Sequence, residues 1–312
     1  MYQKLRRFFK EKISGRAPLS TTNGLVVDVH LEFENIVQRL NYYFLKNPMQ
    51  KKHFEEELAY LNSSFTAAPG VEKKNYAILP YPFVFNYDYT KVPVHKDEAA
   101  GMFYVKMDGK NLYYHKGFTN IADVQKSFTF ICAEQDPKSP HLYMPKDFFV
   151  SEDDAVADFG AAEGNFSLMV VDKVRELFIF EADPIWIEAL QMTFSPWKHK
   201  VHIINKFVGD DQSDNTIRVR DFFKNKKLDF LKMDIEGMEV RVLTDSVSFL
   251  KERKLKMIVT TYHGHSDAAI INHLLQINGY NTSFSDNYML FIYDELRPPF
   301  FRKAIIRASN LK

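Results

Sequence analysis

The sequence has a single cysteine, almost no net charge and no long hydrophobic run. Cys132 alone cannot form an intrachain disulfide, which fits a reducing compartment. The net charge of +1 argues against a dedicated nucleic-acid-binding protein. No apolar run reaches the roughly 18 residues that a membrane span needs, and the basic segment Met1–Arg16 lacks the apolar core of a signal peptide. Met1–Arg16 could rest on an anionic membrane as an amphipathic helix, but a solvated terminal helix is the favoured reading. We therefore expect a cytoplasmic protein without a stable membrane anchor.

The chain is rich in hydrophobic residues, and this predicts a substantial core. Hydrophobic residues make up 46% of the 312 positions, with 28 Phe and 16 Tyr, enough for one large domain or two modest ones. The pattern over 25–61 is helical and is divided at Pro48. Asp108-Gly109 joins two aromatic, β-branched runs in 102–115 and predicts a β-hairpin, and a helix should follow over 122–132. We expect a helical and hairpin region over 1–145, preceding a second domain over 146–312.

From Ala155 onward, apolar strands alternate with helical stretches. This alternation predicts an α/β fold with a mostly parallel sheet and helices on both faces. The last two strands are joined by only three residues, so we expect them to form an antiparallel hairpin at the end of a seven-stranded sheet. The predicted strands are 155–158, 177–181, 201–205, 228–233, 256–261, 279–284 and 288–293.

The first of these strands leads into a glycine-containing turn. The segment AVADFGAAEGNFSL at 155–168 has the spacing D-x-G-x-x-x-G, which differs from the G-x-G-x-x-G of dinucleotide dehydrogenases. Gly160 permits a sharp turn, and Gly164 would let the following helix approach a ligand without a Cβ in the way. Backbone N–H groups at the start of that helix could then face a nucleotide.

The second strand ends in a carboxylate, Glu181. This residue lies 17 positions after Gly164, close to the offset of the acidic residue that holds a ribose in nucleotide-binding folds. A carboxylate can accept hydrogen bonds from both ribose hydroxyls. The alternative is a strand-end carboxylate that caps the helix opened by Pro184. The turn and Glu181 together favour a nucleotide site.

Three motifs together resemble the FkbM-type S-adenosylmethionine-dependent methyltransferases. They are DFGAAEGNFSL at 158–168, FEADP at 180–184 and LDFLKMDIEGME at 228–239, and the resemblance covers roughly 130–293. The run EQDPKSPHLY at 134–143 is similar to the segment before the first motif in some sugar-modifying members. The resemblance implies a Rossmann-like class I methyltransferase fold. It also implies S-adenosylmethionine as cofactor, S-adenosylhomocysteine as product, and a hydroxyl-bearing glycan or polysaccharide precursor as acceptor.

The sequence departs from the family pattern in two places. Members often carry a glutamate near the end of the fifth strand, where this chain has the sequence TTYH at 260–263. Residues 1–100 match no part of the family. The resemblance therefore assigns neither the role of that glutamate nor the residues that select the acceptor in this chain.

The resemblance and the strand-end positions together imply a set of cofactor-binding residues. Asp158 and Glu163 would hold the methionine moiety and Glu181 the ribose. Phe207 or Val208 would pack on the adenine beside Asp210. The full set is Glu134, Asp158, Gly160, Ala161, Glu163, Gly164, Asn165, Glu181, Ala182, Val208, Asp210 and Asp234.

Methylation of a hydroxyl needs a general base, and four side chains are candidates: His263, Asp234, Glu236 and His141. The imidazole pKa near 6.5 favours His263, whereas the position at the fourth strand end favours Asp234. Asp234 and Glu236 could also hold Mg²⁺, but the favoured reading places Glu236 and Glu239 in the first helical turn. His263 and His265 would share one face only if the fifth strand extends to them, and they lack a third ligand. No metal site is predicted.

Two other classes of function are compatible with part of this pattern. A nicotinamide-dependent oxidoreductase would share a Rossmann-like core, but the turn spacing and the expected terminal hairpin count against it. A non-catalytic nucleotide-binding module is disfavoured by the intact turn and the ribose carboxylate.

Overall fold

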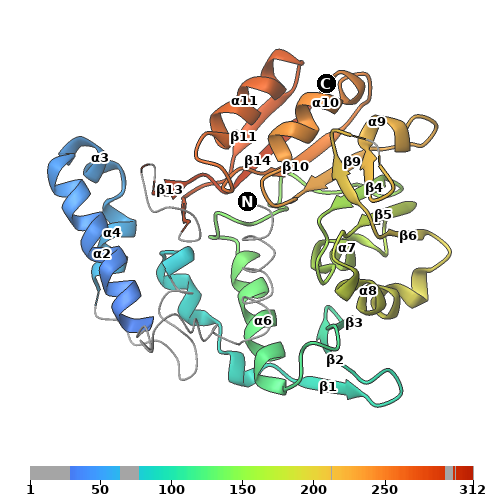
Figure 1. Ribbon diagram of the computed structural model, residues 1–312, viewed down its shortest axis with the longest axis horizontal. Coiled ribbons are helices and arrows are strands. Elements are labelled where there is room, and N and C mark those ends of the chain that lie inside the picture. The colour runs from blue at the N-terminus through green and yellow to red at the C-terminus, as the bar shows by residue number, and fades with distance from the viewer. Residues whose placement is uncertain (1–28, 64–76, 212, 292–297, 299, 312) are drawn as a thin grey trace.

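Seven strands form the central sheet of the computed structural model (Figure 1), which describes residues 29–63, 77–211, 213–291, 298 and 300–311. The strand order is β11-β14-β10-β9-β4-β5-β6. The five strands from β10 to β6 run parallel, and β14 is antiparallel to both of its neighbours. The strands are β4 Ala155–Phe159, β5 Glu176–Phe180, β6 Val201–Ile204, β9 Phe230–Met233, β10 Lys256–Thr260, β11 Asn281–Phe284 and β14 Ile305–Ser309.

The antiparallel partner of β11 differs from the expected one. We expected 279–284 to pair with 288–293, but β11 pairs with β14, with Phe284 opposite Ile306. Met289–Leu290 forms β12 and pairs with β13, Phe301–Arg302, in a separate two-stranded sheet. The side chains of Ile305, Ile306 and Ala308 are fully buried. A central position that buries these apolar side chains is more favourable than an edge position. The predicted hairpin was therefore wrong in its second strand.

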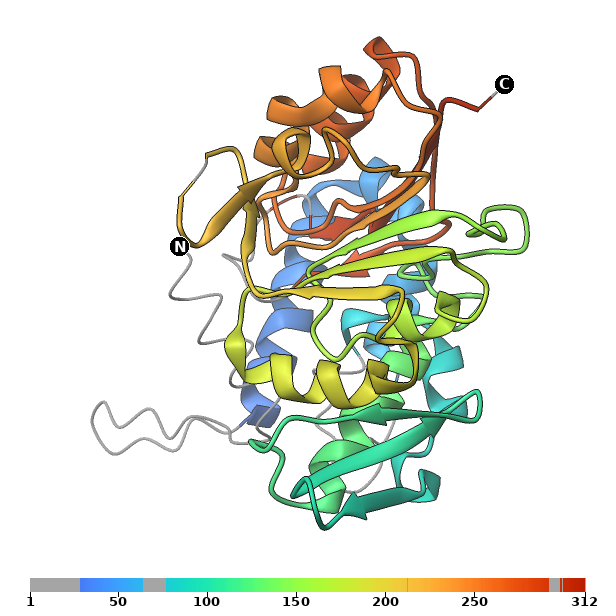
Figure 2. The same cartoon turned by 90° about the vertical axis from the view of Figure 1, so that its right-hand side faces the viewer.

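Helices cover both faces of the sheet, as expected (Figure 2). Helices α9 Val219–Phe222, α10 Glu239–Leu250 and α11 Asp267–Ile277 lie on one face. Helices α7 Asn165–Val170 and α8 Ile187–Phe194 lie on the other, together with the short turns η3 Pro184–Trp186 and η4 Ser195–Trp197. In α10 the residues Val242, Leu243, Ser246, Val247 and Leu250 are buried. Their spacing of three and four positions places one apolar stripe against the sheet.

The elements expected before the sheet are confirmed. Helices α2 Val29–Lys46 and α3 Pro48–His53 are divided at Pro48, and α4 Glu55–Asn62 follows. Asp108 and Gly109 have φ angles of +50° and +80°, as a tight hairpin turn between β2 and β3 requires. The remaining elements are η1 Pro82–Asn86, η2 Tyr89–Lys91, β1 Val94–Asp97, β2 Met102–Met107, β3 Lys110–Tyr113 and α6 Ile121–Glu134. The predicted amphipathic segment Met1–Arg16 lies outside the described residues.

One hydrophobic cluster joins residues from both sides of position 145. Leu40 and Phe44 of α2 belong to the same buried cluster as Val156 of β4 and Phe166 of α7. The rings of Phe44 and Phe301 stack with their centroids 6.0 Å apart. The hydrophobic core therefore continues across the predicted boundary between 1–145 and 146–312, and the division into two domains stays a prediction.

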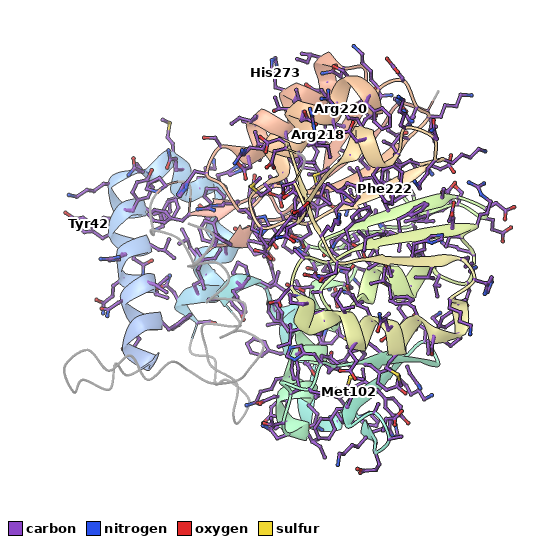
Figure 3. All side chains as sticks on the ribbon, turned by 45° about the vertical axis from the view of Figure 1, so that its right-hand side comes forward. Tyr42, Met102, Arg218, Arg220, Phe222 and His273 are labelled. Atoms are coloured by element: carbon purple, nitrogen blue, oxygen red, sulfur yellow. The ribbon has the colours of Figure 1, made fainter. Side chains whose placement is uncertain are left out.

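The outer side of α2 faces solvent. Tyr42 is 62% exposed and points away from the rest of the molecule (Figure 3). Within the described ranges, none of the helices combines the length and apolar character required to cross a membrane.

Candidate active site

Four strand ends bring the predicted site residues to one edge of the sheet. Asp158 lies in β4, and Glu181 follows β5. Asp234 follows β9, and His263 lies three residues beyond β10. The chain order reverses at β4, which has β5 on one side and β9 on the other. Ligands of open α/β sheets bind at the carboxyl ends of the strands near such a reversal.

The turn after β4 requires glycine at two positions for different reasons. Gly160 has a φ of +76°, and a Cβ there would lie 1.8 Å from the carbonyl oxygen of Asp234. The expected sharp turn is confirmed, and the ends of β4 and β9 approach each other closely. Gly164 has a φ of +86°, and a Cβ there would meet Leu190 at 2.8 Å and Phe194 at 3.0 Å. The space at Gly164 therefore accommodates α8, and the contact of this turn residue with a ligand stays a prediction.

Asp158 forms a buried ion pair beneath this turn. Its Oδ1 lies 3.0 Å from Lys232 Nζ, and its Oδ2 accepts a hydrogen bond of 2.7 Å from Ser167 Oγ. Lys232 Nζ also donates to the carbonyl oxygen of Gly160 at 2.6 Å. Burial lowers the pKa of Lys232, but the charges of Asp158 and Asp234 outweigh it and raise the pKa overall. The ammonium thus ties β9 to the turn, and the predicted contact of Asp158 with the methionine moiety stays a prediction.

Glu181 links the same turn to the end of β5. Its Oε2 accepts a hydrogen bond from the Ala162 N–H at 2.8 Å, and its Oε1 accepts one from the Asp183 N–H at 2.7 Å. Burial raises the pKa of Glu181 to about 7, although the two N–H groups oppose the shift. A carboxylate oxygen accepts more than one hydrogen bond. Glu181 can therefore hold the turn and still accept bonds from hydroxyl groups.

The other predicted turn residues gather around these two carboxylates. Ala161 and Asn165 are buried, and the Asn165 side chain accepts a hydrogen bond from the Phe166 N–H. Glu163 is half-buried in the turn, and the carbonyl oxygen of Ala182 accepts a hydrogen bond from Asn205. The structure brings them together, and their contacts with a cofactor stay predictions.

Val208 and Asp210 follow β6 along the chain and lie near α10. Val208 belongs to β7, Phe207–Gly209, which pairs with β8, Thr216–Arg218, and its side chain packs in the core. The Asp210 carboxylate accepts hydrogen bonds from the Arg241 guanidinium at 3.0 and 3.1 Å. Asp210 thus has a partner within the protein, and the contact of both residues with adenine stays a prediction.

Asp234 is at the centre of a cluster of polar side chains. Its Oδ2 accepts a hydrogen bond from Tyr143 Oη at 3.2 Å and lies 4.0 Å from His141 Nε2. Its Oδ1 lies 3.3 Å from Thr260 Oγ1. Burial raises the pKa of Asp234, but Lys232 and the two histidines outweigh burial and lower the pKa overall. Asp234 is therefore ionised at neutral pH.

His263 lies between Asp234 and two glutamates. Its Nε2 is 3.8 Å from Asp234 Oδ1 and 3.4 Å from Glu236 Oε2, and its Nδ1 is 3.1 Å from Glu239 Oε1. Burial lowers the pKa of this imidazole, but the surrounding carboxylates raise it well above the usual value. These carboxylates favour the protonated imidazole. The base role predicted for His263 would first require the loss of that proton.

Glu236 does not belong to the helix that follows. It has a φ of +59° and Gly237 a φ of +88°, and α10 begins only at Glu239. Two consecutive residues in the left-handed region cannot continue a right-handed helix. The expected placement of Glu236 in the first helical turn was therefore wrong.

His263 and His265 do not share a strand face. Strand β10 ends at Thr260, before either histidine. The Arg302 guanidinium contacts the ring of His265, with Nη2 3.1 Å from Nε2. The conditional expectation of a histidine pair on one face is not met.

The predicted run 134–143 lies against this cluster. His141 and Tyr143 are buried, and their rings lie 5.1 Å apart next to Asp234. Arg307 of β14 donates hydrogen bonds to the carbonyl oxygens of Leu142 and Tyr143. The charge of Glu134, at the end of α6, contributes to the raised pKa of Tyr143 after burial and Asp234. A cavity of about 710 Å³ lies beside this run, and no predicted site residue lines it.

The sequence prediction placed Glu239 in the first turn of the following helix, and this is confirmed. It assigned no role in the site to Lys232, Ser167, Thr260 or Glu239. Lys232 was the most visible of these in the sequence, because it is a charge within the apolar strand FLKM. Glu239 is fully buried and accepts hydrogen bonds from the Ile235 N–H at 2.8 Å and Thr260 Oγ1 at 3.0 Å. No local pattern distinguishes such a buried glutamate from a solvated one at a helix start.

Comparison with known proteins adds a family match. Residues 188–282 match the family described as Methyltransferase FkbM domain, a range that includes the LDFLKMDIEGME motif but not the turn at 158–168. No curated protein matches the chain significantly.

Several solved structures are similar to part of the chain. One is a methyltransferase FkbM from Methylobacillus flagellatus KT, with 18% identity and a TM-score of 0.44, covering 61% of this chain and 54% of that one. A precorrin-6y C5,15-methyltransferase from Geobacter metallireducens GS-15 has 13% identity and a TM-score of 0.36, covering 51% and 82%. An rRNA methylase from Streptococcus thermophilus has 12% identity and a TM-score of 0.33, covering 52% and 90%. The matched part thus spans about half the length of the Methylobacillus flagellatus protein. The family match confirms the resemblance to the FkbM-type methyltransferases over residues 188–282.

Proposed function

We propose that this protein is an S-adenosylmethionine-dependent O-methyltransferase. The observation that carries the proposal is the hydrogen bond from the Ala162 N–H to Glu181, which joins the glycine turn to the ribose carboxylate. The family match over 188–282 supports the same reaction class. The antiparallel β14 beside β10 also fits the class I methyltransferase layout better than that of a nicotinamide dehydrogenase.

The residues at the turn fit the cofactor. Gly160, Ala161 and Ala162 present almost no side-chain bulk beside the buried carboxylate of Glu181. A ribose has two hydroxyl donors, and Glu181 retains acceptor capacity on both oxygens. Asp158 and Lys232 would hold the turn in place from below. When bound, S-adenosylmethionine supplies an activated methyl group on a positively charged sulfur.

The cluster around Asp234 fits proton removal from an acceptor hydroxyl. Asp234 is ionised and is the first candidate for this proton, with His263, Glu236 and His141 as the other predicted candidates. The rings of Tyr143 and Tyr262 lie beside Asp234 and would limit the access of water. Methyl transfer depends mainly on alignment and on the exclusion of water.

The acceptor class rests on the family resemblance alone. We propose a hydroxyl of a sugar or of a polysaccharide precursor, with no nucleic-acid partner. Residues 1–145 would cover the carboxyl edge of the sheet, because Tyr143 already contacts Asp234 across it.

Loss of the Glu181 carboxylate tests the cofactor assignment. Glu181→Ala should weaken S-adenosylhomocysteine binding by about 1–3 kcal/mol, because two ribose hydroxyls lose their acceptor. Isothermal titration calorimetry measures this change. Glu188→Ala is a suitable control, since Glu188 pairs with Lys116 at the surface of α8.

The outcomes of this test separate the candidate classes. Unchanged affinity in Glu181→Ala would remove the ribose assignment. Thermal stabilisation by NAD but not by S-adenosylhomocysteine would instead favour an oxidoreductase. Binding without methyl release to any hydroxyl acceptor would favour a non-catalytic module.

A further inference from the structure

Three metal-ligating side chains converge where β9 and β10 end. One ligand atom from each of Asp234, Glu236 and His263 lies within 4.8 Å of the other two. The imidazole Nε2 faces both carboxylates, at 3.8 Å from Asp234 and 3.4 Å from Glu236. Two ligands of a cation bound at about 2.1 Å stand at most roughly 4.2 Å apart. Small side-chain rotations would therefore bring all three ligand atoms to one ion.

The charges in this cluster favour an added cation. Asp234, Glu236 and Glu239 place three carboxylates around the imidazole of His263. Lys232 lies near but pairs with Asp158 beneath the turn. Like charges at this separation repel strongly when they are shielded from water. A divalent ion would displace the proton that these carboxylates favour on the His263 imidazole and, with its double charge, would relieve the repulsion more fully.

A second observation concerns the buried groups themselves. The His263 side chain is 5% exposed, and its Nε2 faces Asp234 and Glu236 at distances longer than an ordinary hydrogen bond or at its limit. On the other side of the ring, Glu239 Oε1 lies 3.1 Å from Nδ1, a distance at which a small rotation of the ring would align a hydrogen bond that the described residues do not yet form. Glu239 Oε2 is buried and, among the described residues, has no hydrogen-bond partner. A carboxylate behind a histidine ring is the arrangement that orients a metal-binding imidazole.

The backbone at Glu236, one of the three proposed ligands, has an energetically unfavourable conformation. Glu236 adopts a φ of +59°, a conformation that is unfavourable for a residue with a side chain. Such strain persists where the surrounding structure enforces it, and it concentrates at functional sites.

We propose that Asp234, Glu236 and His263 form a binding site for one divalent transition-metal ion. Glu239 orients the imidazole from behind. The donor set contains one nitrogen and two carboxylates, which suits Mn²⁺ and its first-row neighbours better than Mg²⁺ or Ca²⁺, whose ligands are oxygens.

The role of the ion rests on the proposed function. An acceptor hydroxyl coordinated there becomes more acidic. With the ion bound, Asp234, Glu236 and His263 are ligands and do not take the hydroxyl proton, which leaves to solvent. The oxygen lone pair forms the new bond to the methyl carbon, and the carbon–sulfur bonding pair returns to sulfur. The products are the methyl ether, S-adenosylhomocysteine and one proton.

Manganese binding to the full-length chain tests the site directly. We expect one equivalent of Mn²⁺ to bind, detected as loss of the electron paramagnetic resonance signal of free Mn²⁺. Glu236→Gln should abolish this binding, and Glu239→Gln should weaken it about 10–100-fold. Glu176→Gln is the matched control, because Glu176 pairs with His202 at 2.9 Å on the surface, outside the cluster. Thermal melts of each variant check that it is folded.

Each outcome decides the inference. Absence of binding to the wild-type chain, or equal binding by folded Glu236→Gln, would overturn the site. If Mg²⁺ displaced bound Mn²⁺ at equal concentrations, the site would not prefer Mn²⁺, and this would contradict coordination by the nitrogen of His263. Calorimetry with S-adenosylhomocysteine runs in parallel: cofactor binding without Mn²⁺ binding removes only the metal site, and Mn²⁺ binding without cofactor binding removes the proposed function instead.

Discussion

A carboxyl group with a pKa of about 7 at the end of β5 should make cofactor affinity depend on pH near neutrality. Burial raises the pKa of Glu181, so the group is protonated below pH 7 in the free protein. Ribose hydroxyls donate to the ionised form, and binding below pH 7 must first remove the proton. Affinity for S-adenosylhomocysteine should therefore rise with pH, by up to about tenfold per unit below 7, and level off above it.

Calorimetry between pH 5.5 and 8 measures this dependence. The matched variant is Glu181→Gln, which keeps the side-chain shape but has no group that titrates there. The difference between the two affinity profiles isolates Glu181 from other titrating groups. Parallel profiles for the two proteins would show that Glu181 does not control binding.

At the residue scale, position along a strand was the informative signal in the sequence. Asp158, Glu181 and Asp234 were identified because each ends an apolar run, and parallel strand ends meet at one edge. Lys232 and Glu239 were not assigned, because their partners come from distant parts of the chain. The protonation of His263 was equally hidden, since it depends on three carboxylates gathered by the fold.

At the element scale, the close approach of the turn after β4 to the end of β9 depends on the absence of a Cβ at Gly160. Gly160→Ala would place a methyl group against the Asp234 carbonyl and force an unfavourable φ. We expect a loss of about 2–5 kcal/mol in the free energy of unfolding, combining left-handed strain with overpacking. Urea denaturation measures this loss.

Gly109→Ala provides the comparison. Gly109 also has a positive φ, +80°, but a Cβ there would meet nothing within 4 Å. Only the strain of about 1–2 kcal/mol should remain in that variant. Equal losses in the two variants would show that close packing at Gly160 adds nothing.

Sequence patterns were sufficient to locate most strands of the central sheet but not all of them. Six strands of the central sheet were predicted within a few residues, because each is a short apolar or alternating run; they are β4, β5, β6, β9, β10 and β11. The short strands β7 and β8 were not predicted. Strand β14 was missed, since IIRAS contains a central arginine and follows the pair Pro298-Pro299. Arg307 is accommodated there because its guanidinium donates hydrogen bonds to the backbone carbonyl oxygens of Leu142 and Tyr143.

At the scale of the whole molecule, the covering region and the sheet share one core. Leu40 and Phe44 lie in the same cluster as Val156 and Phe166. A truncated chain beginning at Lys146 would expose these buried surfaces and remove Tyr143 from Asp234. We expect it to fold poorly or to lose cofactor binding, as measured by circular dichroism and calorimetry. Full S-adenosylhomocysteine affinity in a well-folded truncated chain would refute the covering role.

The insertion of β14 between β10 and β11 has a consequence for the synthesis of the protein on the ribosome. Strand β10 ends at Thr260, but the strand that pairs with its open side begins only at Ile305. At roughly 5–20 residues per second, that edge stays unpaired for seconds while the intervening chain emerges. Unpaired edges of this kind recruit other strands. A chaperone that shields nascent chains would therefore be needed most while the ribosome synthesises the segment between residues 260 and 305. A chain whose synthesis is interrupted in that interval should aggregate.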